Sequence, residues 1–231
     1  ARYWKKAAVK GLSNAVGLQM AEVQVAIQIP AGGQAQSLAA KLFSETIMDE
    51  TDMVLGSMDV RNAFSDASRA TMYEAIRTNS IPEIRALARL FLASNSCISE
   101  ATNVKVCISE GGAQGDPLMP LAFALGYQKS LAKAQARMGP NGGSIMAYLD
   151  DSYLKGKIAE VLSNMREIAV DMKADIDLEV NPDKSKIIAK NCDHARAIIS
   201  QLRRDDDWFS SVEIGCIPDC DPSNVQWGQG V

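Results

Sequence analysis

The sequence of 231 residues contains no long hydrophobic run and no excess of basic residues. Because no stretch of 18 or more apolar residues occurs, we expect no membrane span. The 24 lysines and arginines are outnumbered by 28 aspartates and glutamates, and the net charge is −4. This balance argues against a domain that binds nucleic acid through a basic face of its own. The 47% hydrophobic content is that of an ordinary globular protein with a real core.

Histidine and cysteine, the usual ligands of structural zinc, are also scarce. The sequence has one histidine, His194, and five cysteines, of which only Cys216 and Cys220 lie close together. This set does not supply a four-ligand zinc site. An odd number of cysteines favours a reduced intracellular protein, cytoplasmic or nuclear, over a disulfide framework.

The first residues, Ala-Arg-Tyr-Trp-Lys-Lys, lack both an initiator methionine and the apolar core of a signal peptide. We therefore expect the chain to be an internal piece of a longer polyprotein.

Hydrophobic periodicity predicts helices and strands in mixed order. A Gly32-Gly33 turn is expected to end the first strand, and a tight hairpin is expected at Asp150-Asp151. Such an order predicts an α+β fold, with an antiparallel sheet backed by helices. The expected helices span about residues 1–20, 35–43, 82–92, 117–138, 158–173 and 193–203. The expected strands span about residues 25–34, 53–60, 104–108, 144–149, 152–156, 178–180, 185–189 and 212–218.

Three aspartates stand at the ends of apolar strands. Asp59 lies near the end of the run 53–60, and Asp150 and Asp151 lie between two apolar segments. If these strands are neighbours in the sheet, the three carboxylates converge at one edge. Clustered carboxylates repel each other unless a divalent cation neutralises them, and oxygen ligands favour Mg²⁺ or Mn²⁺. Aspartate is also a turn former, but Asp-Asp is not a favoured two-residue hairpin pair.

Several segments resemble the motifs of reverse transcriptases, in the order found in that family. The segment "YLDD" is similar to the catalytic box of the family. The sequences of the motifs as a whole are most similar to those of non-LTR retrotransposon polymerases. A stretch at 27–36 resembles a conserved upstream stretch of that group, and 212–219 weakly resembles the primer-grip hairpin. The four main matches are "MDVRNAFSDASR" (58–69), "EGGAQGDPLMPLAF" (110–123), "YLDD" (148–151) and "LEVNPDKSKII" (178–188).

The resemblance implies a polymerase palm over residues 59–220, with part of the fingers at 1–58, a tail at 221–231 and most of the thumb missing. It implies that Asp59 and Asp150 bridge two Mg²⁺ or Mn²⁺ ions. Asp151 would assist them, and the backbone carbonyl of Val60 would be a further ligand.

The resemblance also implies roles for residues that face the nucleotide. Phe64 corresponds to a bulky gate that excludes a ribose 2′-OH, although an aromatic residue there could equally be core. Lys184 corresponds to a proton donor for the pyrophosphate leaving group, or it is merely solvated. Asp116 also fits an N-cap. The residues expected to contact nucleotide or template are Phe64, Gln114, Gly115, Asp116 and Tyr148. Gly111, Gly112 and Gly115 would let the backbone approach nucleic acid. Arg61 and Arg69 could meet phosphates or be surface charge.

The function implied is RNA-directed DNA polymerase, with an RNA template, a DNA primer and dNTPs as partners and no membrane. One alternative is an inactive or domesticated palm fragment that binds nucleic acid or protein. A second is an RNA-dependent RNA polymerase, but those enzymes usually have glycine where Leu149 precedes Asp150. A third is an unrelated Mg²⁺ phosphohydrolase, which would not explain residues 114–118 or Phe64.

Overall fold

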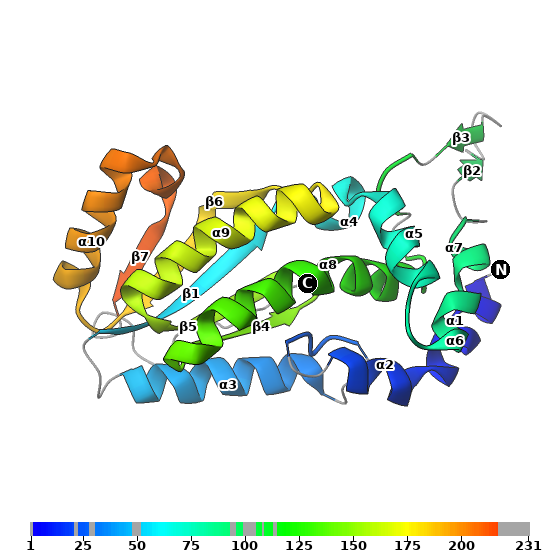
Figure 1. Ribbon diagram of the computed structural model, residues 1–231, viewed down its shortest axis with the longest axis horizontal. Helices are drawn as coiled ribbons and strands as arrows, with labels where there is room; N and C mark the ends of the chain where they lie inside the picture. The colour runs from blue at the N-terminus through cyan, green and yellow to red at the C-terminus, as the bar shows by residue number, and fades with distance from the viewer. Residues whose placement is uncertain are drawn as a thin grey trace.

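A mostly antiparallel sheet forms the centre of the protein (Figure 1). The computed structural model describes residues 2–20, 23–27, 31–47, 52–92, 96–98, 105–107, 109–112 and 115–216. Within these residues the sheet has five strands in the order β4-β5-β1-β6-β7. Neighbouring strands are antiparallel except for the parallel pair β6 and β7. The strands are β1 (Met53–Val60), β4 (Ser144–Tyr148), β5 (Asp151–Lys157), β6 (Val180–Ala189) and β7 (Glu213–Cys216).

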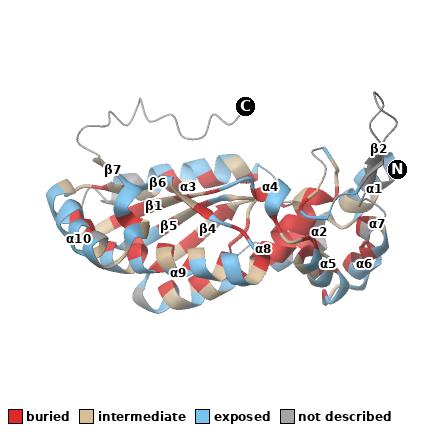
Figure 2. Cartoon of the chain, turned by 90° about the horizontal axis from the view of Figure 1, so that it is seen from above, coloured by how far each residue is buried: buried red, intermediate tan, exposed pale blue. Residues whose placement is uncertain are grey.

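Helices cover both faces of this sheet. Helices α8 (Met119–Met138) and α9 (Ile158–Ile176) pack on one face, and α3 (Gly32–Ile47) packs on the other (Figures 1 and 2). The alternation of side chains along a strand explains this division. In β5, Leu154 is buried in the main core, whereas Tyr153 packs against the small cluster of α3 that contains Ala40.

The remaining helices lie toward the two ends of the molecule. Helix α10 lies beside β7 at one end, and most of the shorter helices lie at the other (Figure 1). The helices at the two ends together are α1 (Arg2–Gly11), α2 (Ser13–Met20), α4 (Ala63–Asp66), α5 (Arg69–Arg77), α6 (Pro82–Ala86), α7 (Ala88–Leu92) and α10 (Cys192–Asp205). A separate antiparallel pair is formed by β2 (Ser96–Ile98) and β3 (Lys105–Cys107), and short 3₁₀ turns span Gly139–Asn141 and Asp207–Ser211.

Helix α8 is the centre of the hydrophobic core, and Figure 2 shows it as largely buried. Its Phe123 ring lies 5.0 Å from Phe64 and 5.9 Å from Tyr127, measured between ring centroids. At Gly126, a Cβ atom would lie 2.8 Å from Ile176 Cδ1 and 3.2 Å from Met72 Cγ. A side chain here would make Ile176 and Met72 shift, so this glycine lets α5, α8 and α9 pack closely.

The α+β prediction is confirmed, and so are the main helices and the strands that carry the aspartates. Five local predictions were wrong. The expected helix 1–20 is two helices that meet at Leu12, and 82–92 is interrupted at Leu87. Gly32 and Gly33 begin α3 rather than form a turn. The described residues of the expected strand 25–34 form no strand, and an isolated bridge joins Gln24, just before it, to Ala147. The two expected strands around Asn181 are one strand, β6.

Two further expectations concern the setting of the protein. None of the helices in the described ranges is long and apolar enough to cross a membrane. The prediction of reduced thiols is wrong for Cys192, which is disulfide-bonded, while Cys107 keeps a free thiol. Cys192 is the first residue of α10, shortly after the end of β6, and the spacing of the cysteines in the sequence had not indicated a bond at this position.

Candidate active site

The strand register brings the three predicted aspartates to one end of the sheet. In the antiparallel pair β1–β5, Met58 lies opposite Ser152. Asp59 follows Met58 and Asp151 precedes Ser152, so the two aspartates come next to each other where the strands pass each other. The sequence hypothesis that these strands are neighbours is correct.

The third carboxylate stands in the turn that joins β4 to β5. Tyr148 and Asp151 are the last paired residues of the hairpin, and Leu149 and Asp150 form its tip. Leu149 has a left-handed backbone conformation, with φ of 56°. Branched residues rarely adopt that conformation, so neighbouring groups must hold it in place.

The pKa shifts of the aspartates show that their negative charges lie close to one another. Burial raises the pKa of Asp150, a backbone hydrogen bond partly opposes this, and the charge of Asp59 raises it further. Burial also raises the pKa of Asp151, and the charges of Asp150 and Asp59 add to the effect. Among the described residues, the ammonium of Lys184 lies beside the cluster, with Nζ 3.9 Å from Asp59 Oδ2. The cluster therefore has more negative charge than its surroundings neutralise.

The donor chemistry of the cluster suits a hard divalent cation. Three carboxylates and the carbonyl of Val60, the residue after Asp59, are oxygen ligands of the kind that Mg²⁺ and Mn²⁺ prefer. In the part of the chain that the structure describes, no three His, Cys, Asp or Glu side chains are arranged as a ready metal centre. The residues thus fit the ion by ligand type and by charge.

The glycine segment before α8 is anchored on the residues that follow Asp59. Gly111 N donates to Ala67 O at 2.8 Å, and Gly112 N donates to Phe64 O at 3.0 Å. Arg69 Nη1 donates to Gly111 O at 2.8 Å. At Gly111, which has φ of 56°, a Cβ would lie 2.2 Å from a backbone oxygen. These glycines therefore serve close packing within the protein, whereas the sequence had suggested approach to nucleic acid.

Arg69 differs from both sequence interpretations, because it is neither surface charge nor free for phosphate. Its side chain is buried, and Nη2 donates to Phe91 O at 2.7 Å while the guanidinium lies 4.4 Å from the Phe91 ring centroid. Arg61 is exposed, as expected.

Phe64 lies next to a small pocket. Its half-buried ring packs on Phe123 and, with Gly115 and Asp116, lines a cavity of about 350 Å³ that Lys6 also reaches. Asp116 Oδ1 accepts from Leu118 N at 3.0 Å, so it caps the turn that leads into α8. The N-cap of α8 itself is Leu118, so the N-cap prediction for Asp116 is wrong by two residues, although its side chain does hold the turn before the helix. Gln114 lies outside the described residues.

Comparison with known proteins now becomes decisive. Residues 6–202 match the family model described as "Reverse transcriptase (RNA-dependent DNA polymerase)". The chain belongs to the reverse transcriptase family. No curated protein sequence matches it.

The fold of this reverse transcriptase chain is similar to that of telomerases. It superposes on apo telomerase from Candida tropicalis with a TM-score of 0.58 and 10% identity, covering 83% of this chain and 36% of that one. Telomerase from Candida albicans in complex with a TWJ fragment of telomeric RNA gives 0.54 and 9%, with 81% and 34% covered. The chain spans about a third of the length of these telomerases. The non-LTR type stays a prediction.

Two other predicted residues of this reverse transcriptase are placed near the carboxylates. Tyr148 is half-buried at the end of β4, and its ring lies 3.5 Å from where a Cβ of Gly33 would be. Lys184 is exposed on β6 beside Asp59.

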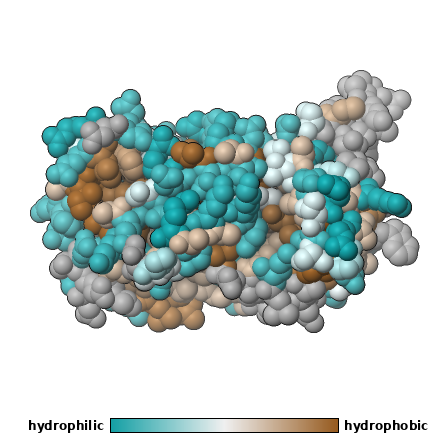
Figure 3. All heavy atoms as spheres, in the orientation of Figure 1, coloured by the Kyte–Doolittle hydropathy of each residue, from teal (hydrophilic) through white to brown (hydrophobic). Residues whose placement is uncertain are grey.

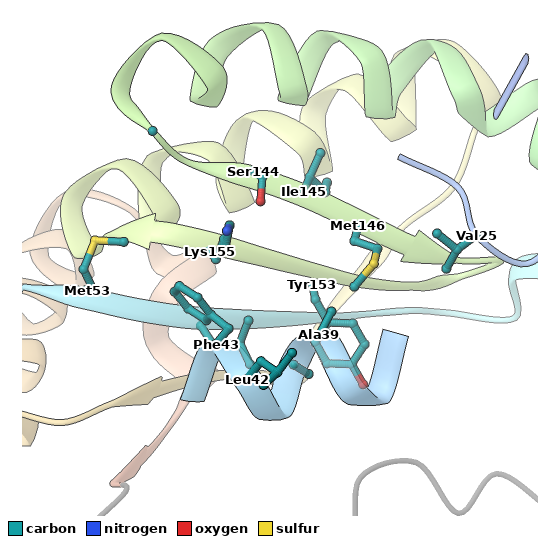
Figure 4. A pocket seen from close by; sticks show the side chains of 13 residues that line it. Val25, Ala39, Leu42, Phe43, Met53, Ser144, Ile145, Met146, Tyr153 and Lys155 are labelled. Atoms are coloured by element: carbon teal, nitrogen blue, oxygen red, sulfur yellow. The ribbon is translucent and has the colours of Figure 1, made fainter. Parts of the chain in front are cut away.

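An apolar pocket of about 540 Å³ lies between α3 and the face of β4 and β5 that α3 covers (Figure 4). Phe43 and Tyr153 line it, and Leu42 is 53% exposed at its side. Figure 3 shows an apolar patch along the edge of the molecule where α3 runs. Strands β4 and β5 build part of this pocket, but none of the predicted site residues lines it.

Sequence reasoning missed the buried polar groups that support the hairpin. Tyr127 Oη and Ser152 Oγ are 2.8 Å apart inside the core, and burial raises the pKa of Tyr127 strongly. Gln24 and Gln36 both hydrogen-bond to the backbone of the turn. A signal was present at Gln24, because it is a single polar residue flanked by Val23 and Val25.

Proposed function

We propose that the chain is the palm of an RNA-directed DNA polymerase, which adds dNTPs to a primer 3′-OH on an RNA template. In this proposal residues 59–220 form the palm, residues 1–58 form part of the fingers and residues 221–231 are a tail. The observation that carries it is the meeting of three aspartates at one end of neighbouring strands, within a reverse transcriptase fold.

The carboxylates of Asp59, Asp150 and Asp151, with the carbonyl of Val60, would hold two Mg²⁺ or Mn²⁺ ions. When bound, such ions favour the ionised primer hydroxyl and neutralise charge on the triphosphate. Burial and the neighbouring carboxylates raise the pKa values of Asp150 and Asp151, and a bound cation would favour the ionised form of both.

The other proposed residues bind and orient the substrate. Phe64 supplies bulk beside the small pocket, where it would exclude a nucleotide that carries a 2′-OH. Gly115, Asp116, Gln114 and Tyr148 are proposed to contact nucleotide or template. Lys184, with its ammonium next to Asp59, is proposed to donate a proton to the pyrophosphate leaving group.

The proposed partners are an RNA template, a DNA primer and dNTPs. The Candida albicans telomerase structure contains a fragment of telomeric RNA, which supports an RNA partner for this fold. Because the net charge is −4, we propose that basic surfaces elsewhere in a longer protein hold the duplex.

A second candidate is an inactive palm fragment that binds nucleic acid or protein. It is favoured by one observation, namely that the described carboxylates are not arranged as a ready metal centre. Against it, all three aspartates are present, whereas a decayed copy is expected to have lost one.

Primer extension separates the two candidates. The native chain is given an RNA template, a DNA primer, dNTPs and Mg²⁺, beside Asp150→Asn and the matched control Asp66→Asn, which changes an exposed aspartate of α4. Extension by the native chain and the control, but not by Asp150→Asn, supports the polymerase. Duplex binding without extension in all three, with or without Mn²⁺, supports the binding module instead.

A further inference from the structure

The turn that carries the catalytic aspartates is held from outside the hairpin. Leu149 stands between Tyr148 and Asp150 in a left-handed conformation, with φ of 56°. Its peptide groups cannot join the β4–β5 ladder, which ends at the Tyr148–Asp151 pair. Leu149 is half-buried, so its N–H and C=O groups need other partners where water does not reach them.

Gln24 supplies both partners. Leu149 N donates to Gln24 Oε1 at 2.8 Å, and Gln24 Nε2 donates to Leu149 O at 3.3 Å. The Gln24 side chain has no exposed surface, so water does not compete for these hydrogen bonds. The side-chain amide of Gln24 therefore makes with Leu149 the two hydrogen bonds that a neighbouring strand would otherwise make.

The backbone of Gln24 is itself fixed to the edge of the sheet. Val25 N donates to Ala147 O at 2.8 Å, and Ala147 N donates to Val23 O at 2.6 Å. Residues 23–25 thus pair in parallel with β4, one residue before the turn begins. A side chain anchored in this way has little freedom, so it fixes the peptide of Leu149 in one orientation.

A second amide contacts the other side of the turn. Gln36 projects from α3, is 7% exposed, and its Nε2 lies 3.4 Å from Asp151 O. Leu149 and Asp151 flank Asp150, so the two glutamines hold the backbone on both sides of that aspartate.

We propose that Gln24, supported by Gln36, is a positioning residue of this polymerase. The two amides hold the turn 148–151 in the backbone conformation that directs Asp150 and Asp151 toward Asp59. The proposal deepens the proposed function and rests on it, because positioning matters only if these carboxylates hold metal. Neither glutamine touches the reacting groups in this scheme.

The test uses the full chain and two variants, each with a matched control. Gln24→Leu keeps the size of the side chain and removes both hydrogen bonds. Its control is Asn164→Leu, which removes a buried amide of α9 that accepts from Arg137 Nε at 2.9 Å. Gln36→Ala is paired with Gln34→Ala, an exposed position on the same helix.

Two readouts do not depend on polymerase activity. The first is the Mn²⁺ dissociation constant from electron paramagnetic resonance, with Asp150→Asn as the blank. The second is hydrogen exchange of the Leu149 amide by NMR. Because supporting hydrogen bonds commonly change metal affinity by 10–100-fold, Gln24→Leu should weaken Mn²⁺ binding by about tenfold or more. Its Leu149 amide should exchange roughly tenfold faster. Asn164→Leu should lose stability yet bind Mn²⁺ within about twofold of wild type.

Equal Mn²⁺ affinity in the wild type and Gln24→Leu overturns the proposal, and so does an equal loss in Asn164→Leu. If Gln24→Leu does not fold, Gln36→Ala decides: weaker Mn²⁺ binding than in Gln34→Ala supports positioning, and equal binding overturns it. Absence of Asp150-dependent Mn²⁺ binding in the wild type removes the proposed function. The Leu149 amide then decides separately whether Gln24 holds the turn.

Discussion

Gly111→Ala tests how the glycine segment is anchored beside the active site. Gly111 has a left-handed backbone with φ of 56°, and an added Cβ would lie 2.2 Å from Ser65 O and 2.4 Å from Phe64 O. Both obstacles are backbone oxygens, which cannot rotate away as a side chain can. The segment must therefore move off the residues that follow Asp59.

The cost follows from two contributions. A left-handed conformation costs an L-residue with a Cβ about 1–2 kcal/mol relative to glycine. Moving the segment also breaks or lengthens the contacts Gly111 N–Ala67 O, Gly112 N–Phe64 O and Arg69 Nη1–Gly111 O. If two of these hydrogen bonds are lost at about 1 kcal/mol each, the free energy of unfolding falls by about 3–4 kcal/mol.

Urea unfolding measures this loss against two matched controls. Gly142 also has positive φ, at 79°, but nothing lies within 4 Å of its added Cβ, so Gly142→Ala should cost only about 1 kcal/mol. At Gly112 the obstacle is the flexible Met119 side chain, which can move, so Gly112→Ala should fall between the two. A Gly111→Ala variant as stable as Gly142→Ala would refute the packing argument.

Three further predictions concern single side chains. Burial and a neighbouring carboxylate raise the pKa of Asp150 above its unfolded value near 3.8. Ionisation of this carboxyl therefore favours the unfolded state. The stability that the protonated form contributes is lost as pH rises through the folded pKa. Without metal, Asp150→Asn should therefore be more stable than wild type at pH 7 in urea unfolding, with a gap that closes toward pH 3.8. Phe64→Ala should raise rNTP incorporation relative to dNTP in primer extension, and an unchanged ratio would remove the gate. Asp175→Asn loses ion pairs to Lys129 and Lys133 at 2.7 and 2.8 Å and should cost about 1 kcal/mol at neutral pH, since both lysines are partly exposed. Hydrogen bonds from the lysines lower the pKa of Asp175, although burial acts in the opposite direction. The cost of Asp175→Asn should therefore vanish as pH falls through the folded pKa of Asp175. A cost that persists in acid would contradict the pairing.

The aspartate cluster could be predicted from the sequence because strand ends are local signals. Met53–Val60 and the segments around Asp150 are continuous or alternating apolar runs, and a polar residue where such a run ends is easily recognised. To predict that Asp59 lies beside Asp151, it was enough to assume that their two strands pair. The order of the motifs along the chain also suggested this pairing. The spatial order of the strands was not accessible, because β1 lies between β5 and β6, which both come much later in the chain.

Residues with tertiary roles could not be predicted from local patterns. The sequence left Arg69 open between phosphate contact and surface charge, yet Arg69 is buried because two carbonyls and the Phe91 ring surround it. Gly32 and Gly33 suggested a turn, but packing of α3 on the sheet outweighs their low helix propensity. Gln24 bonds to a residue 125 positions away, which no periodicity can show.

The treatment of carboxylates elsewhere in the fold makes the aspartate cluster more informative. Between α8 and α9, Asp171 and Asp175 each meet basic side chains at 2.8 Å or less, so buried acid is neutralised within the protein. Among the described residues, Asp150 and Asp151 have no such partner, and their pKa values rise while those of Asp171 and Asp175 fall. The left-handed backbone of Leu149 in the same turn costs further free energy, in addition to this electrostatic cost. The fold pairs Asp171 and Asp175 with basic side chains, but it leaves the half-buried Asp150 and the exposed Asp151 without such a partner and fixes their backbone with buried amides. A divalent cation can supply the positive charge that this site lacks.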